Sequence, residues 1–246
     1  RRSEEERRTP NVEIPLRVSL RQLYTGEVLD VTYHRQTMCV QASECEKKCP
    51  ECAGPGVAVR VQQLAPGFVQ QVQMRDDKCI ARGKCWNRKC KACPNGPTEQ
   101  EAVHLTLEIT RGMREGERIV FPDVADEAVG HLPGDLVFIL DPVPHPEFER
   151  RGNDLYTELD IPLTDALVGF ETAVTHLDGR AVPVVQTGVT SPGQTIQLAG
   201  EGMPQRTRRG EEHGSMFIKF NIIFPKALAG DEHKEQVRRT LSTVQW

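Results

Sequence analysis

The placement of the cysteines restricts the fold of this chain more than any other feature. All eight lie between Cys39 and Cys93, and the rest of the 246-residue chain, from Pro94 to Trp246, contains none. A small protein held together by disulfides would have cysteines along its whole length. The pattern therefore predicts a local cysteine-rich insert, residues 36–97, within a larger body.

The cysteines form two groups of four with similar spacing. Each group begins with a pair separated by five residues and ends in a CxxC pair. The eight positions are Cys39, Cys45, Cys49, Cys52, Cys79, Cys85, Cys90 and Cys93. Four thiolates complete a tetrahedral zinc site, so the insert could hold up to two zinc ions. The wider pairs fit disulfides that close small loops equally well. Zinc and disulfides both remain open at this point.

Basic residues crowd the second cysteine group, at Lys78, Arg82, Lys84, Arg88, Lys89 and Lys91. Such charges lower thiol pKa values and would offset the charge of a zinc tetrathiolate, although a solvated basic loop explains them as well. The chain has a net charge of −4, and the insert shows no recognition-helix pattern. We therefore expect no nucleic-acid partner.

An internal repeat organises the rest of the chain. Val12–His34 aligns with Leu155–Leu177, and each segment reads as a strand, a short apolar helix, a glycine and a second strand. Ser19 and Thr164 are the expected N-caps of the two helices, and Gly26 and Gly169 are expected to end them with positive φ. Two further matches follow in the same order: Ile109–Val124 with Val189–Pro204, and Gly134–Phe148 with Gly214–Leu228.

These patterns predict a mainly β fold of two tandem β-sandwich or barrel-like domains. The first domain is interrupted by the insert, an extended cysteine-rich β-hairpin module, and a short helix follows the second domain. The expected bounds are a linker at 1–10, domain I at 11–35 and 98–148, the insert at 36–97, domain II at 149–228 and the C-terminal helix at 229–246.

Several motifs together resemble one known family. They include CPECAGPG (Cys49–Gly56), a complete CxxCxGxG repeat, and VQQLAPGFVQQVQ (Val61–Gln73). HPEFERRGNDLYTEL (His145–Leu159) and ALVGFETAVTHLDGR (Ala166–Arg180) follow in the expected order. After about residue 10, nearly the whole chain resembles the client-binding C-terminal region of J-domain co-chaperones, the DnaJ family, in the class with a cysteine-rich insert.

The resemblance implies that this region binds unfolded polypeptide and delivers it to a heat-shock 70 type ATPase chaperone. The J-domain would lie outside this sequence, and the full-length protein would be a homodimer that uses its C-terminal end. The implied client pocket consists of Val12, Val31, Tyr33, Leu105 and Phe138. The implied sulfur grouping joins Cys39 and Cys45 with Cys90 and Cys93, and Cys49 and Cys52 with Cys79 and Cys85.

The motifs are most similar to the branch of the family in the endoplasmic-reticulum lumen, where disulfides can replace zinc; the cytoplasm is the alternative. No apolar run is long enough to span a bilayer. We find no catalytic constellation, and the carboxylates of Asp123 and Asp126 are expected to be solvated. The alternative function is a thiol-disulfide oxidoreductase, or a redox-regulated holdase, that uses the CxxC pairs.

Overall fold

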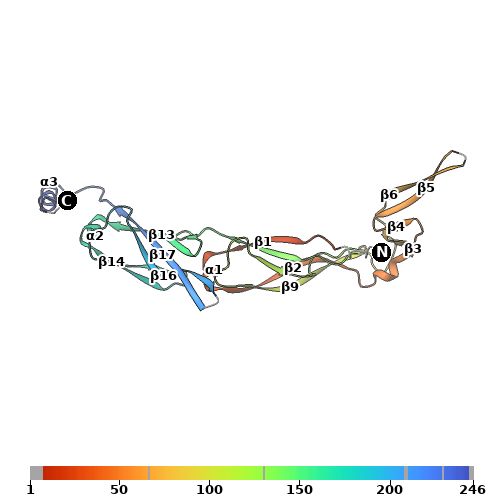
Figure 1. Ribbon diagram of the computed structural model, residues 1–246, viewed down its shortest axis with the longest axis horizontal. Helices are drawn as coiled ribbons and strands as arrows, with labels where there is room; N and C mark the ends of the chain where they lie inside the picture. Colours follow the sequence, from red (N-terminus) through yellow and green to blue (C-terminus); the bar gives the residue numbers. More distant parts are fainter. Residues whose placement is uncertain (1–7, 66, 130, 208–209, 229, 244–246) are drawn as a thin grey trace. The chain divides into compact units, whose positions relative to one another are not determined.

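The structure is a computed structural model that describes residues 8–65, 67–129, 131–207, 210–228 and 230–243 (Figure 1). Its backbone contacts define two compact units. Unit 1 comprises Arg1–Arg17, Val28–Glu108 and Arg114–Asp141. Unit 2 comprises Val18–Glu27, Ile109–Met113 and Pro142–Trp246.

Two small sheets form the β-domain of unit 1. One has the order β1-β11-β10, with β1 at Val12–Val18, β11 at Leu136–Pro142 and β10 at Arg118–Phe121. The other pairs β2 (Glu27–Met38) with β9 (Thr98–Ile109). Both β1 and β2 alternate between exposed and partly buried residues, as strands with one face on a core do.

The cysteine-rich insert connects β2 to β9, so it interrupts the first β-domain as predicted. It begins with a 3-10 turn at Ala42–Cys45 and continues as two three-stranded sheets. The first sheet contains β3 (Glu46–Lys48), β8 (Lys84–Trp86) and β7 (Cys79–Ala81). The second contains β4 (Cys52–Gly54), β5 (Val57–Ala65) and β6 (Phe68–Arg75).

Unit 2 repeats the strand order of the first β-domain. Its main sheet has the order β12-β13-β17-β16, and β14 pairs with β15. The strands are β12 (Glu149–Arg151), β13 (Asp154–Pro162), β14 (Phe170–Thr175), β15 (Ala181–Gln186), β16 (Thr195–Thr207) and β17 (Gly210–Ile223). Thus β13, β17 and β16 correspond to β1, β11 and β10, while β14 and β15 correspond to β2 and β9. The predicted tandem β architecture is confirmed.

One of the three sequence matches is out of register. The pairing places Phe121 opposite Leu136 and Leu198 opposite Met216. Leu136 and Met216 are equivalent in the repeat, so Phe121 corresponds to Leu198 and not to Glu201, its partner in the sequence alignment. The sequence alignment of this segment is therefore three residues out of register.

The two short helices begin differently from each other. Helix α1 (Leu20–Thr25) has the predicted cap, since the Ser19 hydroxyl accepts a hydrogen bond from the Gln22 N–H and the Gln22 side chain accepts one from the Ser19 N–H. Helix α2 (Leu163–Val168) has Pro162 at its N-cap, so the prediction for Thr164 is wrong. Proline has a φ compatible with a helix entrance and needs no partner for an N–H, so the helix starts directly after it.

Gly26 and Gly169 end these helices with φ of 73° and 91°, as predicted. At Gly169 an added Cβ would lie 2.5 Å from the carbonyl oxygen of Gln186, so only glycine fits there.

The C-terminal helix α3 covers Gly230–Leu241, close to the predicted segment, whose last residues lie outside the described part of the chain. Within that part, none of the helices combines the length and the apolarity that crossing a bilayer requires.

Candidate functional site

The five residues of the implied client pocket come together in unit 1. Phe138, on β11, is 5% exposed and forms the centre of an apolar cluster with Leu107 and Leu136. The other four, Val12, Val31, Tyr33 and Leu105, lie at its border and are partly buried. Phe138 is therefore the floor of the cluster, and the other four form a partly accessible rim.

Tyr33 lies in a mixed apolar and charged environment. Burial raises the pKa of its phenol, the nearby Asp126 carboxylate raises it further, and Arg35 opposes this effect. The hydroxyl therefore stays neutral over the physiological range and can donate a hydrogen bond.

The strands beside this cluster have open edges. Within the described residues β1 pairs only with β11, and β2 pairs only with β9. An open edge presents unpaired backbone N–H and C=O groups that another extended chain can use. An apolar rim and an open strand edge thus lie next to each other in unit 1.

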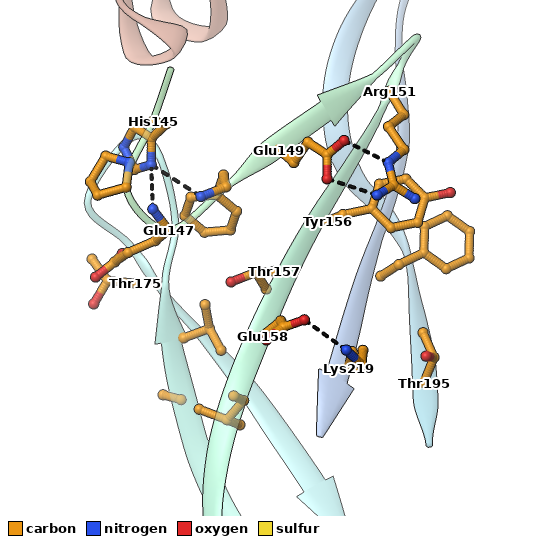
Figure 2. A pocket seen from close by; sticks show the side chains of 16 residues that line it. His145, Glu147, Glu149, Arg151, Tyr156, Thr157, Glu158, Thr175, Thr195 and Lys219 are labelled. Atoms are coloured by element: carbon orange, nitrogen blue, oxygen red, sulfur yellow. Dashed lines mark hydrogen bonds and ion pairs between the residues drawn. The ribbon is translucent and has the colours of Figure 1, made fainter. Parts of the chain in front are cut away.

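Unit 2 contains a polar hollow of ≈ 880 Å³, lined mainly by β12, β13, β14 and β17 (Figure 2). Glu149 pairs with Arg151, whose guanidinium lies 4.3 Å from the centre of the Tyr156 ring. Glu158 pairs with Lys219 at 2.8 Å. Hydrogen bonds from Arg151 and Lys219 lower the pKa of the two glutamates, so both carboxylates remain ionised at neutral pH.

Three disulfides cross-link the insert: Cys39–Cys93, Cys45–Cys90 and Cys52–Cys79. The first two bridges belong to one buried cluster that also contains Trp86 and Ile80, and the third belongs to a second cluster that contains Ala58. The sulfurs are therefore grouped as the resemblance implied. The expectation of disulfides within the wider pairs is wrong, because the bridges join residues 54, 45 and 27 positions apart.

Cys49 and Cys85 are thiols, and both pack against the Cys52–Cys79 cluster. The pKa of Cys85 is raised, first by burial and then by its hydrogen bond with Cys49, and these effects outweigh the nearby Lys78 and Lys47. The expectation that basic neighbours lower the thiol pKa is thus wrong for Cys85.

The bridged insert does not fit zinc. A tetrahedral structural site needs four ligands, whereas the bridges leave only two thiols as donors. The described residues also contain no group of three or more histidine, cysteine or acidic side chains arranged to hold a metal ion.

Asp126 and Glu127 are functional candidates that the sequence analysis missed. Asp126 is exposed, as expected, and its Oδ1 also accepts a hydrogen bond from the Gln36 backbone N–H at 2.8 Å. The Glu127 carboxylate accepts one from the Met38 N–H, also at 2.8 Å. Asp123 likewise pairs with Arg8 at 2.7 Å. These partners lie about ninety positions or more away in the chain, and no local motif indicates such contacts.

Comparison with known proteins identifies the class of this β architecture. The family model described as "DnaJ C terminal domain" matches residues 12–225. "DnaJ protein homolog 1" of Allium porrum is 36% identical over 239 residues, which cover 93% of this chain and 60% of that protein. "Chaperone protein dnaJ 3" of Arabidopsis thaliana is 34% identical over 260 residues, covering 99% and 61%. "DnaJ homolog subfamily A member 2" of Homo sapiens is 37% identical over 230 residues, covering 89% and 56%.

The chain therefore belongs to the DnaJ family, and it contains that family's C-terminal domain. It spans about 60% of the length of these curated relatives. Their names do not refer to the endoplasmic reticulum, so the expected lumenal assignment gains no support from them.

Proposed function

We propose that this region binds unfolded polypeptide segments and that the full-length protein delivers them to a heat-shock 70 type ATPase chaperone. The observation that carries the proposal is the partly accessible apolar rim beside the open edge of β2. Relatives named as chaperone proteins support it.

Binding proceeds by strand addition in this proposal. Successive residues of a strand direct their backbone groups to opposite edges, so alternate residues of β2 offer N–H and C=O groups to an incoming chain. An apolar client side chain then inserts between Val31, Tyr33 and Leu105. The contact area is small, which suits a weak and reversible interaction that accepts many sequences.

Suppression of aggregation of an unfolded protein, without ATP, tests the proposal. Replacing Tyr33 and Leu105 together by serine removes apolar surface from the rim and should weaken suppression several-fold. Val40→Ser is the matched control, because Val40 is 96% exposed and lies outside the cluster. Equal suppression by wild type and the double variant would contradict the pocket assignment.

We also propose that the insert works in its disulfide form, in the lumen of the endoplasmic reticulum. Support comes from the three bridged pairs, since disulfides persist in oxidising compartments. Titration of the unfolded protein without reductant should then detect two thiols and no zinc. Eight thiols with two zinc ions would favour the cytoplasmic alternative.

A homodimer of the full-length protein is the last part of the proposal. An apolar groove of ≈ 870 Å³ lies between α2, the end of β17 and α3, and Phe224 and Val237 at this groove are 64% and 42% exposed. Burial of these side chains against a second copy would stabilise a dimer. Phe224→Asp should shift the mass measured by sedimentation from dimer to monomer.

A further inference from the structure

The chain itself closes one end of the open β2 edge. The Glu127 N–H donates to the Gln36 carbonyl at 2.7 Å, and the Asp126 carboxylate accepts from the Gln36 N–H at 2.8 Å. The Glu127 carboxylate accepts from the Met38 N–H. These are the backbone groups that an added strand would otherwise use. Every second residue of β2 directs its backbone N–H and C=O groups to this edge. The groups that remain available for an added strand therefore belong to Val28, Asp30, Thr32 and His34.

The closed end carries negative charge. Asp126 is exposed and lies close enough to Tyr33 to act on its hydroxyl group. The nearby cations are engaged by other acids: Arg35 pairs with Glu101 at 2.9 Å, and Arg8 pairs with Asp123. Within the residues that the structure describes, no ion pair involves Asp126. An approaching strand therefore meets a carboxylate where its own end must stop.

We propose that Asp126 makes this site prefer client segments that carry a lysine or arginine at the end reaching the closed edge. The proposal rests on the function proposed above and adds a determinant of specificity to it. The available edge, Val28–His34, accommodates a strand of about seven residues, or about 23 Å. An exposed pair of opposite charges changes affinity by about two- to five-fold, so the preference is modest and sensitive to salt.

Binding of fluorescent heptapeptides to the whole chain tests the proposal. One peptide is neutral and leucine-rich with capped ends, and the others carry Lys or Glu at the first or the last position. We expect Lys at one of the two ends to tighten binding about two- to five-fold and Glu there to weaken it, with both effects reduced in 1 M salt. The first position will show the effect if the peptide adds antiparallel to β2, and the last position if it adds in parallel.

Asp126→Asn is the informative variant, because an asparagine oxygen can still accept the Gln36 N–H while the charge is removed. It should bind the neutral peptide as wild type does and lose the difference between Lys and Glu. Asp123→Asn, on the same loop, is the control and should keep that difference. Circular dichroism and unfolding curves verify that both variants fold.

The possible failures are distinguishable. If wild type binds the neutral peptide but does not distinguish Lys from Glu, or if Asp126→Asn keeps the distinction, the charge preference is wrong and polypeptide binding stands. If no peptide binds, the proposed function fails together with this inference.

Discussion

Tyr33, in β2, and His176, which directly follows the end of β14, occupy equivalent positions in the two repeats. Tyr33 is partly exposed, whereas His176 is 3% exposed. The centre of the His176 ring lies 4.6 Å from the centre of the Tyr24 ring. Val12 is partly exposed as well, and its equivalent Leu155 is fully buried. Thus one strand order gives a partly open apolar cluster in the first domain and a closed core in the second.

At the positions that line the hollow of the second domain, charged side chains take the place of apolar ones in the first domain. Glu158 and Lys219 form an ion pair in the second domain, where the first domain has Pro15 and Ile139. The second hollow is therefore lined by paired charges, whereas the first cluster is bordered by apolar side chains (Figure 2). The two domains share the same backbone pairing, whereas differences at the inner positions close the apolar core of the second domain and differences at the outer positions give that domain a hollow lined by charges.

Core truncation at an equivalent pair should have the largest effect and should be similar in the two domains. Leu140 is 1% exposed and Phe220 is fully buried, and they occupy equivalent positions in β11 and β17. We expect Leu140→Ala to cost about 2–5 kcal/mol and Phe220→Ala about 3–5 kcal/mol of unfolding free energy. Hydrogen exchange, which reports on each domain separately, is the measurement.

Val189→Ala is the control for these variants, because Val189 is 67% exposed and its truncation should change stability by only about 0.5 kcal/mol. A small loss at Leu140 with a large loss at Phe220 would show that the first domain lacks a core of its own, and the comparison would have to be withdrawn.

Much of this organisation could be predicted because it depends on local patterns. Alternating residues indicated β1 and β2, Ser19 indicated a cap, and the spacing of the motifs located the insert. Local patterns do not specify which cysteines are bridged, because Cys39 and Cys93 are 54 positions apart and come together only through the strand pairing of the insert. The closed edge at Gln36 and the partly open rim around Tyr33 likewise depend on tertiary packing, which periodicity does not specify.

A proline at equivalent edge positions should affect the two domains differently. The Gln36 N–H points away from β9 to the Asp126 carboxylate, and because alternate residues point the same way, the Thr32 N–H faces the open edge. The His176 N–H donates to the Arg180 carbonyl, so the N–H of the preceding residue, Thr175, faces away from β15. Thr32→Pro removes a donor needed for strand addition and should weaken binding of the neutral heptapeptide about ten-fold, the equivalent of one net hydrogen bond. Thr175→Pro should leave binding unchanged.

Thr32→Ala separates the backbone effect from the loss of the side-chain hydrogen bond to His104, and it should bind as wild type does. If Thr175→Pro weakens binding as much as Thr32→Pro, the closed second domain takes part in client binding, and the functional half of the comparison is wrong.

The smallest effect should come from the ion pair that distinguishes the second domain. Hydrogen bonds from Lys219 and Asn221, followed by the charge of Lys219, lower the pKa of Glu158. A lowered pKa in the folded state gives stability that is present above the ordinary glutamate pKa and is lost as the pH falls through the lowered value. Glu158→Gln should therefore destabilise unit 2 slightly at pH 7 and less at pH 3, and the effect is small because the pair is about half exposed and screened by water. Urea unfolding at the two pH values measures the difference, and an equal loss at both would mean that Glu158 acts through packing and not through its charge.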